Sequence, residues 1–198
     1  MPLIAKICAT AITPLSRRSR RGRQRGLTII EIAITLTISA VLAASAIPSF
    51  SHLLDRQRLS MTANDVNAAM QLARSEAITH GQRVAVAPVN GVNWASGWRV
   101  FVDRNDNGVF DEGDLVVREF SAAPDRIHIT PHFSAGISGR FVSFDPNGRT
   151  RQPGSNGMLL GRLVIVVGGP ADAPTAQNSR SVCFAVARVR TVSGGICS

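Results

Sequence analysis

One long apolar segment limits what this chain of 198 residues can fold into. Residues 27–47 (LTIIEIAITLTISAVLAASAI) contain a single ionisable side chain, that of Glu31. As a helix rising about 1.5 Å per residue they extend about 31 Å, and the hydrocarbon core of a bilayer is roughly 30 Å thick. We therefore expect residues 27–47 to form a single transmembrane helix.

The residues before this segment predict its orientation. Residues 1–26 carry seven positive charges and no acid: Lys6, Arg17, Arg18, Arg20, Arg21, Arg23 and Arg25. By the positive-inside rule such a cluster stays in the cytoplasm. The part of the chain beyond residue 47 then lies on the other side of the membrane.

Two ordinary explanations exist for such an N-terminus. One is a secretory signal peptide cleaved after Ala44-Ser45-Ala46, and the other is a plain membrane anchor. Neither accounts for Glu31, because a charged group at membrane depth costs a few kcal/mol and usually marks a partner.

Residues 26–31 (Gly26-Leu27-Thr28-Ile29-Ile30-Glu31) resemble the prepilin-peptidase site of type IV pilins and type II secretion pseudopilins. The resemblance implies that prepilin peptidase removes a leader of residues 1–26 by cutting between Gly26 and Leu27, and that Leu27 is then N-methylated. Glu31 would be the fifth mature residue, which pairs with the N-terminal amine of a neighbouring subunit in the filament. Pro48 would be mature residue 22, where the family commonly has a helix-kinking proline.

Residues 48–80 have the pattern of an amphipathic helix that continues the apolar one. Apolar residues recur in steps of four and three at Leu59, Ala63, Val66, Met70, Ala73 and Ala77. This spacing places them on one helical face. We expect the helix to run to about Thr79 and to end at Gly81.

Residues 81–198 read as a β-rich head. We expect strands at residues 83–89, 98–103, 115–120, 126–130, 140–144, 163–167 and 182–190, separated by Gly, Pro, Asn and Asp. The predicted fold class is α+β, with a long N-terminal helix packed on antiparallel sheets. This order resembles the pilin-like fold, and residues 67–77, 97–103 and 144–149 resemble its GspH/FimT type.

An acidic loop follows the second expected strand. Oxygen-bearing side chains fall at calcium-loop spacing at Asp103, Asn105, Asn107, Asp111 and Asp114, around a glycine at position 108. A standard EF-hand has Glu at the last position and helices on both sides, whereas the flanks here read as strands. The alternative is a hairpin loop whose Asp and Asn side chains cap their own backbone.

Charge is divided unevenly beyond the leader. Residues 27–125 hold 7 Arg and 11 acids, whereas residues 126–198 hold 8 Arg and 2 acids. Arg188 and Arg190 are two apart, so in a strand they project from one face, which suits a phosphate backbone. They stand where DNA-uptake members of the FimT type carry Gly-Arg-x-Arg, although Ala187 replaces the Gly. The alternative is a solvated basic surface.

Three cysteines are present, and Cys8 lies in the leader. In a periplasmic head Cys183 and Cys197 can form a disulfide, worth roughly 3 kcal/mol for a loop of this length. The bridge would flank Arg188 and Arg190.

No pattern typical of catalysis or of cofactor binding occurs, so we expect no enzyme, no cofactor and no firm metal site. We expect a minor pilin or pseudopilin, a structural subunit of a type IV pilus or a type II secretion system. Its partners would be other pilins, the prepilin peptidase/N-methyltransferase and the inner membrane. The alternative function is a DNA-binding minor pilin that captures DNA during natural transformation.

Without the leader the chain has 15 basic and 13 acidic residues, a net charge of +2.

The leader hypothesis predicts the mature N-terminus. Mass spectrometry of the protein isolated from its host membrane should find a chain that starts at methylated Leu27. A chain that starts at Ile47 would instead support the signal peptide.

Overall fold

The computed structural model describes residues 26–134, 140–155, 157–169 and 172–197. Residues 1–25, which hold nearly all of the expected leader, lie outside this range. The chain divides into two compact units, Met1–Ser45 and Ala46–Ser198. Helix α1 (Ile29–His80) contributes to both, and each unit is considered by itself.

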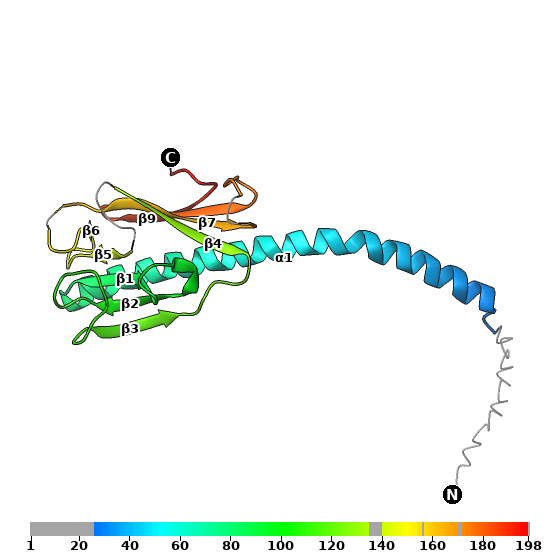
Figure 1. The fold of residues 1–198 in the computed structure, drawn as a ribbon, viewed down its shortest axis with the longest axis horizontal. Coiled ribbons are helices and arrows are strands. Elements are labelled where there is room, and N and C mark those ends of the chain that lie inside the picture. Colours follow the sequence, from blue (N-terminus) through cyan, green and yellow to red (C-terminus); the bar gives the residue numbers. More distant parts are fainter. Residues whose placement is uncertain (1–25, 135–139, 156, 170–171, 198) are drawn as a thin grey trace, which may run out of the picture. The chain divides into compact units, whose positions relative to one another are not determined.

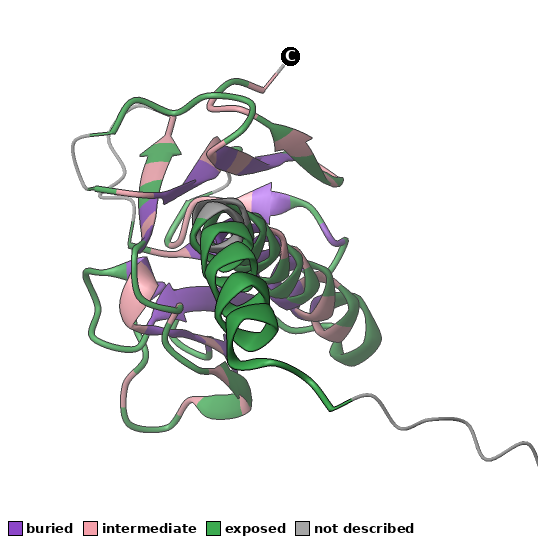
Figure 2. Ribbon diagram, turned by 90° about the vertical axis from the view of Figure 1, so that its right-hand side faces the viewer, coloured by how far each residue is buried: buried purple, intermediate pink, exposed green. Residues whose placement is uncertain are grey.

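In the first unit, α1 buries none of its apolar side chains. Ile29 is 88% exposed, and the other large apolar residues up to Leu42 are also exposed, as the green part of the helix in Figure 2 shows. Among the helices whose residues are described, none is long and apolar enough to cross a membrane. Residues 45–47 of the expected transmembrane segment belong to the part of α1 whose side chains are not described.

In the second unit, α1 buries one stripe. Leu59, Ala63, Val66, Met70, Ala73 and Ala77 are all at most 1% exposed, which confirms the periodicity. The helix ends at His80, where Gly81 adopts a left-handed φ of 63°. A glycine in this conformation is a common end to a helix because it has no Cβ to clash.

The head contains two antiparallel sheets. The first has the order β3-β2-β1-β5-β6, formed by β1 (Val84–Pro88), β2 (Trp98–Val102), β3 (Leu115–Phe120), β5 (Val142–Phe144) and β6 (Thr150–Arg151). A short 3-10 helix, η1 (Trp94–Ser96), lies between β1 and β2. The second sheet has the order β4-β7-β8-β9, formed by β4 (Ile127–Phe133), β7 (Leu160–Val167), β8 (Ser179–Ala185) and β9 (Arg188–Ser193).

The two sheets form separate layers that share one core with the C-terminal half of α1 (Figure 1). Both sheets contribute buried side chains to the core around the stripe of α1. The first sheet supplies Val84, Val86 and Val100, and the second supplies Leu163, Ile165 and Phe184. The outer face of the second sheet therefore points away from the helix. The fold class α+β, with one helix packed on antiparallel sheets, is confirmed.

Two of the expected strands differ from those in the structure, and one strand was not expected. Residues 182–190 are not one strand but the end of β8, a turn at Val186 and the start of β9. The sequence there has no Gly, Pro, Asn or Asp to mark the turn, and Val186 itself takes a φ of 52°. β4 continues through Pro131, which an edge strand tolerates because its N–H side can face solvent. β6 was missed because it is only two residues long.

Gly97 offers a test of the packing between β2 and β3. Its φ is 102°, and an added Cβ would lie 2.7 Å from the Phe120 carbonyl oxygen. Gly113 has nearly the same φ, 103°, with nothing within 4 Å of the added atom. We expect Gly97→Ala to lower the free energy of unfolding by about 2–4 kcal/mol and Gly113→Ala by about 1–2 kcal/mol, because only the first adds a clash to the strain. Urea denaturation measures both, and equal losses would contradict the clash.

Candidate functional site

The start of α1 carries the expected processing site. Gly26, Leu27 and Thr28 precede the helix, and the peptide bond between Gly26 and Leu27 lies in this exposed, non-helical segment. The Thr28 hydroxyl oxygen accepts a hydrogen bond from the backbone N–H of Glu31 at 3.3 Å, as an N-cap residue does. Glu31 is thereby held in the first turn, where the helix dipole favours a negative charge.

Pro48 lies within α1, which continues past it in both directions. Its side chain is outside the described part, so the expected kink stays a prediction.

Asp55 joins α1 to the start of β4. One carboxylate oxygen lies 3.0 Å from a guanidinium nitrogen of Arg126, and the other lies 3.5 Å from Arg58. Asp55 is only 9% exposed, and Arg126 has a left-handed φ of 70°. The sequence gives no signal for the pair of Asp55 and Arg126, since its members are 71 positions apart.

The acidic loop between β2 and β3 is bonded mainly to itself. The Asp103 carboxylate accepts hydrogen bonds from the N–H groups of Asn107 and Gly108, at 3.2 and 2.8 Å. Asp114 accepts from the N–H groups of Arg104 and Asp111. These are the contacts of a hairpin loop that caps its own backbone, and Gly108 has a φ of 73°.

The amide groups of Asn105 and Asn107 both donate to Asp111, at 2.9 and 2.7 Å. These two bonds lower the pKa of Asp111, whereas burial raises the pKa of Asp103. Over the whole described part of the chain, no group of three or more His, Cys, Asp or Glu side chains is arranged to hold a metal ion.

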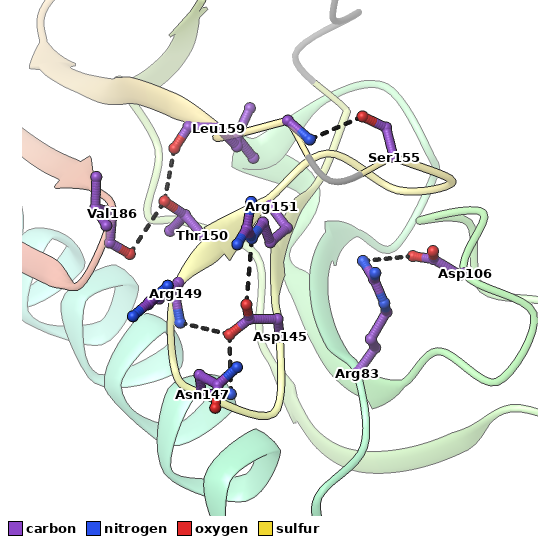
Figure 3. A network of polar contacts seen from close by, with 11 residues as sticks. Arg83, Asp106, Asp145, Asn147, Arg149, Thr150, Arg151, Ser155, Leu159 and Val186 are labelled. Atoms are coloured by element: carbon purple, nitrogen blue, oxygen red, sulfur yellow. Dashed lines mark hydrogen bonds and ion pairs between the residues drawn. The ribbon is translucent and has the colours of Figure 1, made fainter.

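A second self-bonded turn closes β5 and β6 (Figure 3). One oxygen of Asp145 accepts from the N–H groups of Asn147 and Arg149, both at 2.9 Å, and the other accepts from Arg151 at 3.2 Å. Burial acts to raise the pKa of Asp145, but the Arg149, Arg151 and Asn147 bonds outweigh it and bring the pKa below its usual value.

Thr150, the residue of β6 that follows this turn, fixes the hairpin that carries Arg188 and Arg190. The Val186 carbonyl accepts hydrogen bonds from the N–H of Thr150 at 2.6 Å and from its hydroxyl at 3.2 Å (Figure 3). Thr150 belongs to the first sheet and Val186 to the turn between β8 and β9. The bonds therefore tie the two sheets together beside Arg188.

Arg188 and Arg190 are both exposed on β9, on one face of the second sheet. The expected disulfide between Cys183 and Cys197 is present, with a Cα–Cα distance of 6.1 Å. A hollow of about 450 Å³ is lined by Arg188, Arg190 and both cysteines. Arg162 from β7 also lines it. Sequence reasoning counted Arg162 only among the eight arginines of residues 126–198. The expected strand began at residue 163, and the order β7-β8-β9 cannot be derived from the sequence.

The Asp145 turn predicts a pH dependence. A carboxyl group whose folded pKa is lowered stabilises the fold above its unfolded pKa, and this contribution is lost as the pH falls through the folded pKa. We expect Asp145→Asn to lower the free energy of unfolding at neutral pH by about 2–4 kcal/mol, and to flatten the decline of stability below about pH 4. Urea denaturation across this pH range checks both, with Asp65→Asn on the exposed face of α1 as control. An unchanged pH profile would contradict the network.

Comparison with known proteins agrees with this architecture. Residues 62–189 match the family described as "Type II transport protein GspH", and residues 21–47 match the "Prokaryotic N-terminal methylation motif". The chain is 30% identical over 152 residues to the pilin-like protein PilA1 of Thermus thermophilus, covering 74% of this chain and 88% of that protein.

Solved structures are similar as well. The type IV minor pilin FimU of Pseudomonas aeruginosa aligns with a TM-score of 0.50 at 18% identity, over 70% of this chain and 90% of that one. The minor pseudopilin EpsH from the type 2 secretion system of Vibrio cholerae aligns with a TM-score of 0.45 at 13% identity, over 69% and 97%. With the family match over most of the head and the methylation motif at the start of α1, the chain belongs to the GspH family of minor pilins and pseudopilins, structural subunits that associate with other pilins in a type IV pilus or type II secretion pseudopilus.

Proposed function

We propose that the mature protein begins at Leu27 and acts as a structural filament subunit with no catalytic role. The supporting observation is the apolar surface of α1 in the first unit. Leu27 is 71% exposed, Ile29 88% and Leu36 65%, with no partner in the described chain to cover them. Apolar surface of this extent requires the bilayer before assembly and neighbouring helices after it.

The leader and the head take opposite sides of the inner membrane in this proposal. The basic residues 1–26 remain cytoplasmic until prepilin peptidase removes them, and residues 81–198 form the periplasmic head. Residues 27–47 anchor the subunit before assembly and enter the filament core afterwards.

Glu31 sets the axial register of the subunit. It is the one ionisable group in residues 27–47, and cleavage creates an α-amine four residues before it. Within an apolar bundle a carboxylate must find a partner, and the α-amine of a neighbouring subunit supplies the opposite charge.

The test is incorporation into filaments. We expect Glu31→Gln to reduce the amount of protein in sheared filaments at least tenfold, because breaking a buried ion pair costs about 3–5 kcal/mol. Glu112→Gln, which removes a carboxylate from the exposed acidic loop, is the matched control. Immunoblots of the filament and membrane fractions measure both variants. Equal incorporation of Glu31→Gln and wild type would refute the role of Glu31.

A second candidate function is DNA capture by the head, carried by Arg188 and Arg190. Both are exposed, and the four strands of the second sheet contain four Arg and no acid: Arg162, Arg180, Arg188 and Arg190. Arg162, Arg188 and Arg190 share one face of the sheet, and a surface of this kind can neutralise phosphates without reading bases. The glycine missing at position 187 is no obstacle to a tight turn here, since Val186 adopts the left-handed φ and Thr150 holds it.

Gel-shift titration tests this function. The double variant Arg188→Ala/Arg190→Ala should bind duplex DNA at least tenfold more weakly than wild type, with a reduced dependence on salt. A double variant that binds like wild type would remove these residues from the DNA site.

A further inference from the structure

The outer face of the second sheet brings a third arginine next to the predicted pair. In the pairing of β7 with β8, Arg162 lies opposite Cys183, and in the pairing of β8 with β9, Cys183 lies opposite Arg190. The three residues therefore form one row across the sheet and share a face. Neighbouring strands are about 4.8 Å apart, so the two arginine Cα atoms are roughly 10 Å apart, with the cysteine between them.

All charged side chains that line the hollow over this row are positive. Arg162, Arg188 and Arg190 line it together with apolar groups and the disulfide, and its lining contains no Asp or Glu. Within the described ranges, no carboxylate forms an ion pair with any of these three guanidinium groups. This differs from the first sheet, where Arg99 pairs with Glu119 and Arg151 with Asp145.

Of the three arginines, Arg162 has a buried hydrogen-bond donor that is left unpaired. Its Nε atom is buried, and it has no hydrogen-bond partner among the described atoms. A buried donor on a charged group is costly to leave unpaired, so an acceptor that reaches the Arg162 guanidinium group would offset that cost. His132, opposite Arg162 on β4, cannot balance the charge, because an imidazole is either neutral or positive. Burial and then Arg162 itself lower the pKa of His132.

We propose that Arg162 anchors a phosphate-binding pocket on the outer face of the second sheet, completed by Arg188 and Arg190. Guanidinium groups present planar pairs of N–H donors that match phosphate oxygens. Three such groups supply more donors than a single carboxylate can accept, which favours a phosphate group. The inference extends the second candidate function, because it places one backbone phosphate of DNA at Arg162 rather than only at the exposed pair.

The disulfide and Thr150 give this pocket a fixed shape. Cys183 lies in the row itself, and its bond to Cys197 holds the C-terminal segment at the rim of the hollow. Thr150 holds the turn before Arg188. The arginines on β9 thus lie between a turn held by Thr150 and a C-terminal segment held by the disulfide, as preorganised recognition requires.

The first test examines the pocket without DNA. The full-length protein in detergent micelles is titrated with inorganic phosphate while the arginine Nε–Hε signals are followed by ¹⁵N NMR, and the Arg162 signal is assigned by its absence in Arg162→Lys. We expect the Arg162 signal to shift with saturation. A signal that does not move overturns the pocket.

The second test uses fluorescence anisotropy with a labelled DNA duplex between about 50 and about 200 mM salt. We expect Arg162→Gln to weaken binding about tenfold and to lower the salt slope by about one. Arg162→Lys keeps the charge but lacks Nε, and should remain several-fold weaker than wild type. Arg104→Gln, which removes an exposed charge from the acidic loop, is the matched control and should bind nearly as wild type.

The outcomes separate the two proposals. If binding requires Arg188 and Arg190 but Arg162→Lys and Arg162→Gln bind like wild type, DNA capture stands and the anchor role of Arg162 is overturned. If phosphate shifts the Arg162 signal while wild type binds no DNA, the pocket stands and DNA capture fails. Melting temperatures of all variants should match wild type. If Arg162→Lys fails to fold, the absence of a signal in Arg162→Gln assigns the Arg162 signal instead, and the titration of the wild-type protein then decides on the pocket.

Discussion

Helix α1 has an exposed apolar surface in its first part and packs against the two sheets in its second part. The rest of the structure depends on this difference. Over its first turns the apolar residues are distributed around the whole circumference and remain exposed, whereas from Leu59 onwards they narrow to a single stripe that two sheets cover. A helix that is apolar all round belongs inside a membrane or a bundle, and one with a single stripe belongs against a core. The change from one pattern to the other divides the chain into a part that needs neighbours and a part that folds around its own core.

The head uses its charged side chains mostly for local order. Asp103, Asp114 and Asp145 accept hydrogen bonds from nearby backbone N–H groups, and Asp55 links the helix to β4 through Arg126. The described acids of the head are therefore concentrated in loops and on the helix, and the strands of the second sheet carry only positive charge. The strands of the second sheet therefore contain no acid that could offset Arg162, Arg188 and Arg190.

Most of the architecture could be predicted because its signals are local. The spacing of Leu59, Ala63 and Val66 shows one helical face, and Gly or Pro marks most of the strand ends. The turn at Val186 has no such residue, since contacts from Thr150 hold its unusual backbone, and tertiary contacts of this kind leave no pattern in a sequence. The same limit applies to Arg162 and to the pair of Asp55 with Arg126, which depend on strand register and on distant partners.

The disulfide between Cys183 and Cys197 has a mechanical consequence for the neighbouring strand β9. β9 is an edge strand near the end of the chain, and such a strand is normally the easiest to peel from its sheet when a molecule is pulled. The segment that follows β9 is tied at Cys197 to Cys183 in the middle of β8, and Arg188 at the start of β9 follows a turn held by Thr150. Force applied at Cys197 is therefore passed through the disulfide to Cys183 on β8 and does not pull directly on the strand that carries Arg188 and Arg190.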